Sequence, residues 1–320
     1  MYSFAVKRGL AVTGRVVVSV AVAACLWMFI RGIEWDRLEH TVANAKIWPL
    51  VVAMVLYFAM PWGKAACWRT MLAPRYDVPT SHLVRYTVVG YAASVIAPAR
   101  AGELLRVWLL RHRDGVPITD GAAVAVAEKL VEAVSLLILL APLPWLLPEL
   151  PTWVGLSILA CAGVALGLFA ALYVAVGRMR SRDPRSWFGR FIAGMHVLHS
   201  GKRLVVAFAL LFGVWIVDVV LVMLVLYATG IDLPIAAALL ILFGMNLAIM
   251  APSTPASIGA WEVGVLAATR LLGVPDEPAL AFALLHHFAQ LVPLMIVGPV
   301  LEWRLVIGRS STLANGRASR

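Results

Sequence analysis

Charged residues are scarce in this sequence. Only 14% of its 320 residues are charged, 62% are apolar, and the mean hydropathy is +0.89. A soluble globular domain is about 45–50% apolar and about 25% charged. The composition therefore excludes a water-soluble fold and indicates an integral membrane protein.

Cysteines and recognisable catalytic motifs are also few or missing. Cys25, Cys67 and Cys161 are odd in number, far apart and set in apolar sequence, which excludes a disulfide framework and a paired-cysteine metal site. The chain has no G-x-S-x-G, Walker A or H-E-x-x-H motif. We therefore expect no metal, no cofactor and no intramembrane enzyme, and a nucleotide-driven pump is disfavoured.

Acidic residues are outnumbered, with 17 Asp and Glu against 27 Lys and Arg, a net charge of +10. In so apolar a chain this excess reflects loop orientation and anionic lipid headgroups rather than nucleic acid. Basic residues gather before the first apolar run, after the second, and between Arg178 and Arg203, whereas the loops at 148–152, 230–234 and 273–278 contain acidic residues and no Lys or Arg, and the loop at 31–46 is mixed. We expect a multi-pass protein of the bacterial inner membrane with both termini in the cytoplasm.

Six apolar runs are long enough to cross the hydrocarbon layer, which takes about 20 helical residues. They lie near residues 14–31, 47–64, 121–147, 152–176, 204–229 and 279–303. They predict an all-α membrane domain over residues 14–305, preceded by a cytoplasmic N-terminus at 1–13 and followed by a basic cytoplasmic tail at 306–320. The first run is long enough to be retained as a span rather than cleaved as a signal peptide.

Two further segments, 83–113 and 235–272, are interrupted by proline near their middles, at Pro98 and at Pro252 and Pro255. Neither arm of the first comfortably spans a bilayer. Broken backbone is tolerated at membrane depth where it faces protein or a wet cavity. We therefore predict two re-entrant helical hairpins; eight full spans are the alternative.

The two broken segments lie in similar surroundings about 158 residues apart. The first copy contains Ala97-Pro98, Gly102-Glu103 and Gly115-Val116-Pro117, and the second contains Ala251-Pro252, Gly259, Glu262 and Gly273-Val274-Pro275. Copies spanning about 14–147 and 152–303 would be inverted, because the hairpins enter from opposite sides. Inverted repeats with broken helices are typical of alternating-access carriers; chance matches in a chain rich in Gly and Pro are the other interpretation.

Charged residues cluster at the first break, where Arg100, Glu103 and Arg106 follow the proline closely. Such groups are costly within a bilayer and usually face the bundle interior. A guanidinium suits bidentate capture of a phosphate. The alternative is a brace between arginine and glutamate that holds the hairpin closed.

The predicted third and fifth spans carry further ionisable residues. Glu128, Lys129 and Glu132 lie within one helical turn of each other, with Glu128 and Glu132 on one face. They could form a structural ion cluster or handle substrate and protons. Asp218 lies near the middle of its span with no charge within a turn, which suits either a buried neutral acid or a proton carrier.

In the second copy Pro252, Pro255, Gly259 and Glu262 mirror the first break, and His287 falls where Lys129 does. His286 takes the position of Glu128 and Gln290 that of Glu132. Adjacent histidines point about 100° apart on a helix, so they do not predict a metal site.

These motifs together resemble the flippase-like family built on the membrane domain of lysylphosphatidylglycerol synthases, which includes hopanoid-associated members. The resemblance covers about residues 10–305. It rests on Ala97-Pro98-Ala99-Arg100-Ala101-Gly102-Glu103-x-x-Arg106, Glu128-Lys129-x-x-Glu132 and Pro252-x-x-Pro255-x-x-x-Gly259-x-x-Glu262. The family's usual Glu-Arg-x-x-Asp is replaced by the second of these, and Ala256 and Ser257 stand where a glycine is expected.

The resemblance implies lipid translocation without lipid aminoacylation, because only a short basic tail follows the membrane part. We expect an anionic phospholipid, a polyprenyl-phosphate lipid or a hopanoid as substrate. The alternative is a non-transporting subunit that presents lipid to a separate glycosyl- or aminoacyl-transferase. A lipid-modifying enzyme and a second copy of the chain are the protein partners to consider.

Overall fold

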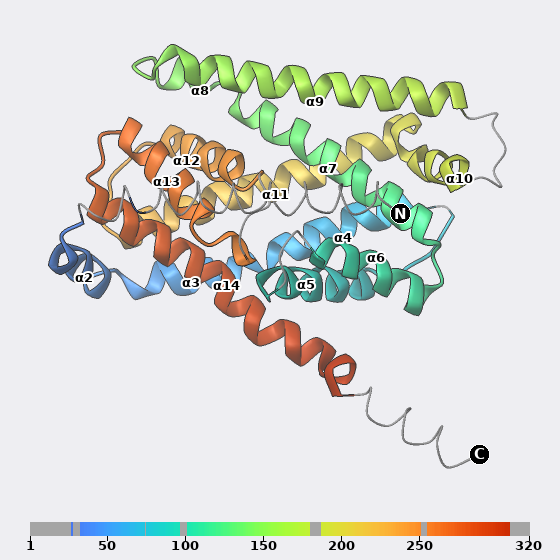
Figure 1. The fold of residues 1–320 in the computed structure, drawn as a ribbon, viewed down its shortest axis with the longest axis horizontal. Helices are drawn as coiled ribbons and strands as arrows, with labels where there is room; N and C mark the ends of the chain where they lie inside the picture. The colour runs from blue at the N-terminus through green and yellow to red at the C-terminus, as the bar shows by residue number, and fades with distance from the viewer. Residues whose placement is uncertain are drawn as a thin grey trace, which may run out of the picture.

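The computed structural model describes residues 27, 33–73, 75–96, 101–179, 187–250 and 255–307. Within these ranges every regular element is a helix. The long helices run roughly along the longest axis of the molecule (Figure 1). The chain is therefore an all-α membrane protein, as its composition predicts.

The first half of the chain contains seven helices within the described residues. They are α2 (Trp35–Ala43), α3 (Ile47–Tyr57), α4 (Ala59–Leu72), α5 (Thr80–Ile96), α6 (Ala101–Asp114), α7 (Ile118–Leu140) and α8 (Leu143–Leu146). The second half has α9 (Thr152–Met179), α10 (Trp187–Gly194), η1 (Met195–His199), α11 (Gly201–Ala228), α12 (Ile235–Ala248), η2 (Pro255–Ser257), α13 (Ala260–Leu271) and α14 (Asp276–Ile307).

Four helical segments of the described chain are long and apolar enough to cross a membrane. They are Ile47–Leu72, Thr152–Arg178, Gly201–Ala228 and Asp276–Leu301. Each overlaps a predicted span. The predicted span at 14–31 lies outside the described residues, apart from Trp27.

Two predicted boundaries are wrong. The span expected at 47–64 continues to Leu72, so Lys64 lies inside the helix pair α3–α4 rather than in the loop that follows it. The span expected at 121–147 ends as α7 at Leu140, and α8 begins after Pro142, where proline cannot supply the next backbone hydrogen bond. Lys64 is therefore a buried cation within a long apolar helical segment.

The two interrupted segments form two packed helix pairs, α5 with α6 and α12 with α13. The pairs lie toward opposite ends of the molecule (Figure 1). At 17 and 14 residues, α5 and α6 are about 25 Å and about 21 Å long, shorter than the hydrocarbon layer of about 30 Å. Residues 97–100 and 251–254, which contain Pro98, Arg100 and Pro252, lie outside the described residues.

The second helix pair reaches the first through η2, which packs against α5. This contact places the end of α12–α13 that carries Pro255 beside the first pair, as an inverted repeat predicts. That the pairs enter the bilayer as re-entrant hairpins, rather than as short full spans, stays a prediction.

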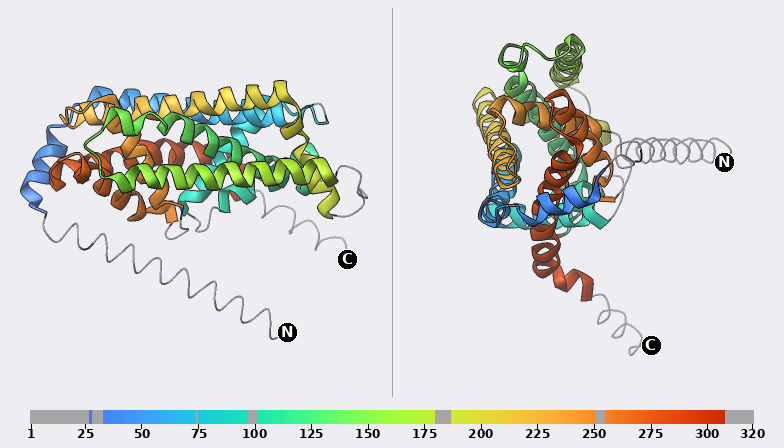
Figure 2. Two further views of the ribbon diagram at one scale, coloured as in Figure 1. Left: turned by 90° about the horizontal axis from the view of Figure 1, so that it is seen from above. Right: turned by 90° about the vertical axis from the view of Figure 1, so that its left-hand side faces the viewer.

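Two apolar clusters hold the bundle, and α11 belongs to both. Ala207 and Leu211, in its first half, pack with α4, α6 and α7, whereas Val222 and Val225 pack with α3, α12 and α14. In contrast, α9 lies at the periphery (Figure 2) and leaves Leu156 and Leu159 exposed. The apolar core therefore surrounds α11. The helices that pack against α11 also enclose charged side chains.

Candidate functional site

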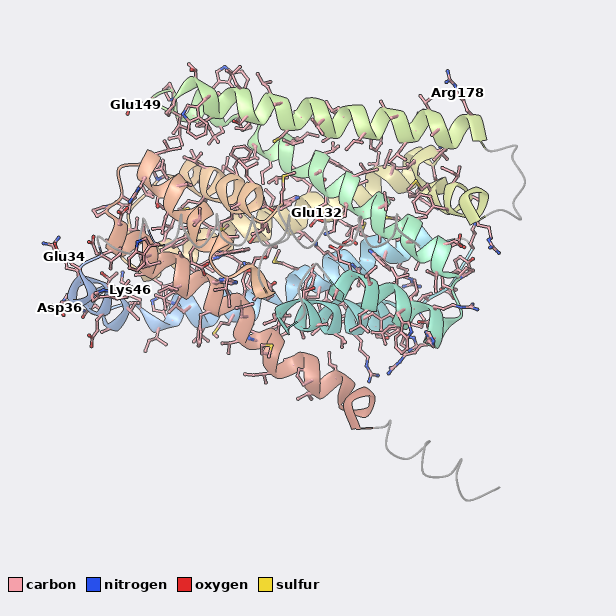
Figure 3. The ribbon with its side chains drawn as sticks, viewed as in Figure 1. Glu34, Asp36, Lys46, Glu132, Glu149 and Arg178 are labelled. Atoms are coloured by element: carbon pink, nitrogen blue, oxygen red, sulfur yellow. The ribbon has the colours of Figure 1, made fainter. Side chains whose placement is uncertain are left out.

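Six ionisable side chains from α4, α6 and α7 meet inside the bundle. This charge network comprises Lys64, Glu103, Arg106, Glu128, Lys129 and Glu132. Figure 3 shows Glu132 midway along the molecule, whereas the other labelled charges, such as Glu34 and Arg178, lie near its ends. Three cations and three anions give the network no formal net charge.

Glu128 is the centre of the buried part of the network. It accepts hydrogen bonds from Nε1 of Trp68 at 2.5 Å and Nη1 of Arg106 at 3.0 Å. The Arg106 guanidinium also lies 3.7 Å from the centre of the Trp68 ring. An indole ring attracts a desolvated cation, so Trp68 holds both members of the ion pair in place.

The remaining contacts extend the network toward the surface. Lys64 contacts Glu132 at 2.5 Å, and Lys129 contacts Glu132 at 3.0 Å and Glu103 at 3.1 Å. The side chains of Lys129 and Glu103 are each 41% exposed, whereas those of Arg106 and Glu128 are 7% and 3% exposed. The network therefore has an accessible end at Lys129 and a buried end at Arg106.

The buried end contains hydrogen-bond donors that are not used. Nε and Nη2 of Arg106 are buried and have no hydrogen-bond partner among the described residues. These two nitrogens form one edge of the guanidinium, the kind of donor pair that binds a phosphate or carboxylate in bidentate fashion. Two hydrogen-bond donors at the buried end are therefore unused by the described residues.

The described charges of α6 pair with α7, while Arg100 lies outside the described residues. Glu103 and Arg106 do not pair with each other among the described contacts; both reach across to α7. Gly102 lies against Gly90 so closely that any side chain at Gly102 would collide with the backbone of α5. Gly102 therefore permits the close approach of α5 and α6 that places these two residues.

Sequence reasoning missed Lys64 and Trp68 as members of the site. They are four residues apart on α4, with 6% and 1% of their surfaces exposed, and so share a helical face. The available signal was the apolar sequence that continues after Lys64 through Ala65, Ala66 and Cys67.

Asp218 of α11 is buried, and its Oδ1 has no hydrogen-bond partner among the described residues. One turn earlier, Nε1 of Trp215 donates to the backbone carbonyl of Glu132 at 3.0 Å. This bond joins α11 to α7 beside the charge network, so Asp218 lies on a helix that borders the site.

The second copy has a smaller polar centre around Glu262 of α13. Glu262 accepts a hydrogen bond from the backbone N–H of Gly259 at 2.6 Å, and its Oε1 lies 2.7 Å from Nδ1 of His287. Nε2 of His287 lies 3.1 Å from the carbonyl oxygen of Ala256. Both sides of the His287 ring therefore hold the turn that follows Pro255.

That turn has an unusual backbone. Ala256 and Ser257 have φ of 54° and 59°, and Gly259 has φ of 87°. Left-handed conformations are unfavourable for residues with a Cβ. They occur here at the two positions where the resemblance led us to expect a glycine.

Each of the two copies contains a contact between a glutamate and a basic side chain, and the two contacts have similar sequence spacing. Glu103 and Lys129 are 26 residues apart, and Glu262 and His287 are 25 residues apart. In each pair a glutamate on the second helix of the packed pair contacts a base on the following long helix. The first pair is half-exposed, whereas the side chains of the second are 6–7% exposed.

Metal binding finds no support in the described part of the chain, where no group of three His, Cys, Asp or Glu side chains could hold an ion. His286 and His287 point to different partners: His287 contacts Glu262, and His286 stacks between Trp261 and Phe282. The contacts described in the site are ion pairs and hydrogen bonds.

Comparison with known proteins is consistent with this architecture. The sequence model of the family described as lysylphosphatidylglycerol synthase TM region matches residues 12–298. A protein described as "UPF0104 membrane protein" from Methanothermobacter thermautotrophicus (strain Delta H) is 23% identical over 267 residues, which cover 72% of this chain and 76% of that protein.

Proposed function

Because the chain belongs to the lysylphosphatidylglycerol synthase transmembrane-region family, we propose that it moves an anionic lipid between the two leaflets of a membrane. Phospholipids and polyprenyl-phosphate lipids share the phosphate that the site would recognise. We place the protein in the bacterial inner membrane with both termini in the cytoplasm, on the distribution of basic loops.

One observation carries this proposal: the unused Nε and Nη2 edge of Arg106 within the membrane domain. Buried donors without partners cost about 1–3 kcal/mol each, so an arginine kept in this state favours a ligand that completes its hydrogen bonds. A neutral hopanoid would leave that edge unused, which makes an anionic headgroup the better substrate.

The gradient of exposure along the charge network supports a route for the headgroup. A phosphate can first replace Glu103 as the partner of half-exposed Lys129. Arg106 is buried and paired with Glu128 of α7. The headgroup therefore reaches Arg106 when α6 moves relative to α7 and this ion pair opens. Exchange of one carboxylate for one phosphate keeps the charge of the site nearly balanced, which lowers the cost of carrying an anion across the apolar layer.

The test uses purified protein in vesicles that contain a fluorescent phosphatidylglycerol, with a reducing quencher added outside. We expect the protein to expose inner-leaflet lipid to the quencher. Arg106→Ala and Lys129→Ala should slow this exposure at least about tenfold, the effect of losing about 1.4 kcal/mol of interaction. Arg106→Lys should also be slow, because lysine lacks the two-donor edge.

Arg37→Ala is the matched control, since Arg37 is 71% exposed and pairs only with nearby Glu34 in the described contacts. Arg100→Ala extends the test to the arginine that lies outside the described residues. Full movement with Arg106→Ala would contradict the headgroup site. Lipid binding to the wild-type protein without movement would instead favour the subunit that presents lipid to a transferase.

A further inference from the structure

Both ring nitrogens of His287 face hydrogen-bond acceptors. Nδ1 lies 2.7 Å from Oε1 of Glu262, and Nε2 lies 3.1 Å from the carbonyl oxygen of Ala256. A carboxylate and a backbone carbonyl only accept hydrogen bonds, whereas a neutral imidazole has a single N–H to donate. A neutral His287 beside an ionised Glu262 would therefore point the lone pair of one nitrogen at an acceptor.

One additional proton completes both contacts. On His287 it gives an imidazolium, which donates from both nitrogens. On Glu262 it gives a carboxylic acid that donates to Nδ1, while the ring N–H donates to Ala256. In either position the pair has no net charge, whereas the pair without this proton carries one negative charge. The two side chains are only 6–7% exposed, and an uncompensated charge at such a place is costly.

The surroundings of the pair also favour the proton. The Trp261 ring stacks on His287 with 5.1 Å between the ring centroids, and the face of an indole attracts a cation. Oε2 of Glu262 accepts the backbone N–H of Gly259 at 2.6 Å, which leaves Oε1 for His287. The additional proton therefore lies between Oε1 and Nδ1.

Few titratable groups lie near this pair among the described residues. His286, adjacent on α14, interacts electrostatically with His287, and Tyr57 of α3 borders a cavity beside His286. Ionisable side chains on other helices packed against α14 contact other groups; they include Arg85, Tyr86 and Tyr91 of α5, Asp218 of α11 and Arg270 of α13. Those of α2, which are Asp36, Arg37 and His40, border a cleft with Glu277 at the beginning of α14.

The turn that His287 holds has an unfavourable backbone. Ala256 and Ser257 have φ of 54° and 59°, a region that residues with a Cβ rarely adopt. The next residue, Ile258, is 56% exposed, so the turn borders the outside of the bundle. Through η2 the turn packs against α5, and α5 packs against α6, which carries Arg106. A change in this turn would therefore reach the helices that hold the charge network.

We propose that Glu262 and His287 form a proton-binding site that holds the turn at 256–259 closed against α5. With the proton bound, both contacts of His287 are complete. When the N–H bond at Nε2 breaks, its electron pair stays on the ring and the proton passes to water. Nδ1–H continues to donate to Glu262, but Nε2 now presents a lone pair to the Ala256 carbonyl, and the turn opens. This inference goes beyond the proposed lipid movement and does not depend on it.

Amide hydrogen exchange of residues 256–262 in the full chain, purified in detergent, measures how often the turn opens. Exchange is compared at about pH 6 and about pH 9, relative to an unfolded peptide of the same sequence, which removes the chemical effect of pH. If the closed turn holds one proton more than the open turn, the ratio of closed to open form falls up to about tenfold per pH unit where histidine titrates. We expect at least about tenfold less protection at the higher pH.

Glu262→Gln distinguishes a proton site from a structural contact. Its amide oxygen can accept from Gly259 and its amide N–H can donate to Nδ1, so that a neutral His287 donates to Ala256. This neutral bond is weaker than a charge-assisted one but needs no proton, and protection should be equal at both pH values. His287→Phe keeps a ring without donors and should open the turn at both. His199→Gln is the control with the wild-type response, because His199 is exposed and lies in η1.

Wild-type protection that is equal at the two pH values would overturn the proton site. A full wild-type pH response in Glu262→Gln or in His287→Phe would overturn it too, since the proton would then bind elsewhere. None of these measurements requires lipid movement. The vesicle experiment therefore decides the proposed function separately, and either proposal can fail while the other stands.

Discussion

Nδ1 of His287 lies 2.7 Å from Oε1 of Glu262, and this contact repeats in the second copy the 3.1 Å pair of Lys129 with Glu103. In both pairs a glutamate on a short helix contacts a basic side chain on a longer helix. The exposure of the two pairs differs. The second pair is enclosed while the first is half-exposed. We propose that the unequal exposure of these two pairs reflects one state of an alternating-access cycle between inverted copies.

The two pairs should contribute unequally to stability. A double-mutant cycle with Glu262→Gln and His287→Gln should give a coupling of about 1–3 kcal/mol, because the pair is buried and also holds the turn at Ala256. The cycle with Glu103→Gln and Lys129→Gln should give about 0.2–1 kcal/mol, since water competes for exposed charges. Denaturant unfolding in detergent measures both; equal couplings would contradict the assignment of one closed and one open pair.

The Trp68 indole N–H should be important for the buried end of the network. Trp68→Phe keeps an aromatic ring under Arg106 but removes the donor to Glu128. We expect a loss of about 1.5–3 kcal/mol of unfolding free energy, the contribution of one hydrogen bond to a charged group, because Oε2 of Glu128 keeps its bond from Arg106. Trp62→Phe on the same helix is the control, because Trp62 is 56% exposed and its replacement should change stability by less than about 0.5 kcal/mol.

Close packing of the second helix pair should not tolerate a methyl group. A Cβ at Gly264 would lie 2.5 Å from the carbonyl oxygen of Gly244 and 2.9 Å from Ala248. Gly264→Ala should therefore lower stability by about 1–3 kcal/mol through overpacking. Gly163→Ala meets open space and should be neutral or slightly stabilising, by at most about 1 kcal/mol of helix propensity. Thermal unfolding of both variants in one detergent compares the signs directly.

Orientation in the membrane can be tested by labelling in intact cells. In a variant without Cys25, Cys67 and Cys161, a cysteine at Arg190 should be protected from an impermeant thiol reagent, because the basic loop is predicted to be cytoplasmic. A cysteine at Asp232, in an acidic loop, should react. The reverse pattern would invert the predicted topology, and permeabilised cells show that both positions are chemically reactive.

The fold class, four of the long spans and most of the residues of the charge network could be predicted from the amino-acid sequence. These inferences depend on local properties. An apolar run has only one way to satisfy its backbone in lipid without a partner, which is a helix, and charges such as Glu128 within such a run have to face the interior. That the two interrupted segments belong to a repeat stays a prediction.

Which charges pair could not be predicted before the packing of the helices was known. Lys64 and Glu132 are 68 residues apart and Trp68 and Glu128 are 60 apart, so no helical periodicity relates them. The same holds for Tyr57 and His286, which meet at one cavity from helices at opposite ends of the sequence. Local sequence determines which face of a helix a residue occupies, whereas the choice of partner depends on how close the helices can approach. Gly90 and Gly102 allow α5 and α6 to approach closely because neither residue has a side chain. The sequence does not show that these two glycines face each other, since that depends on how the two helices pack.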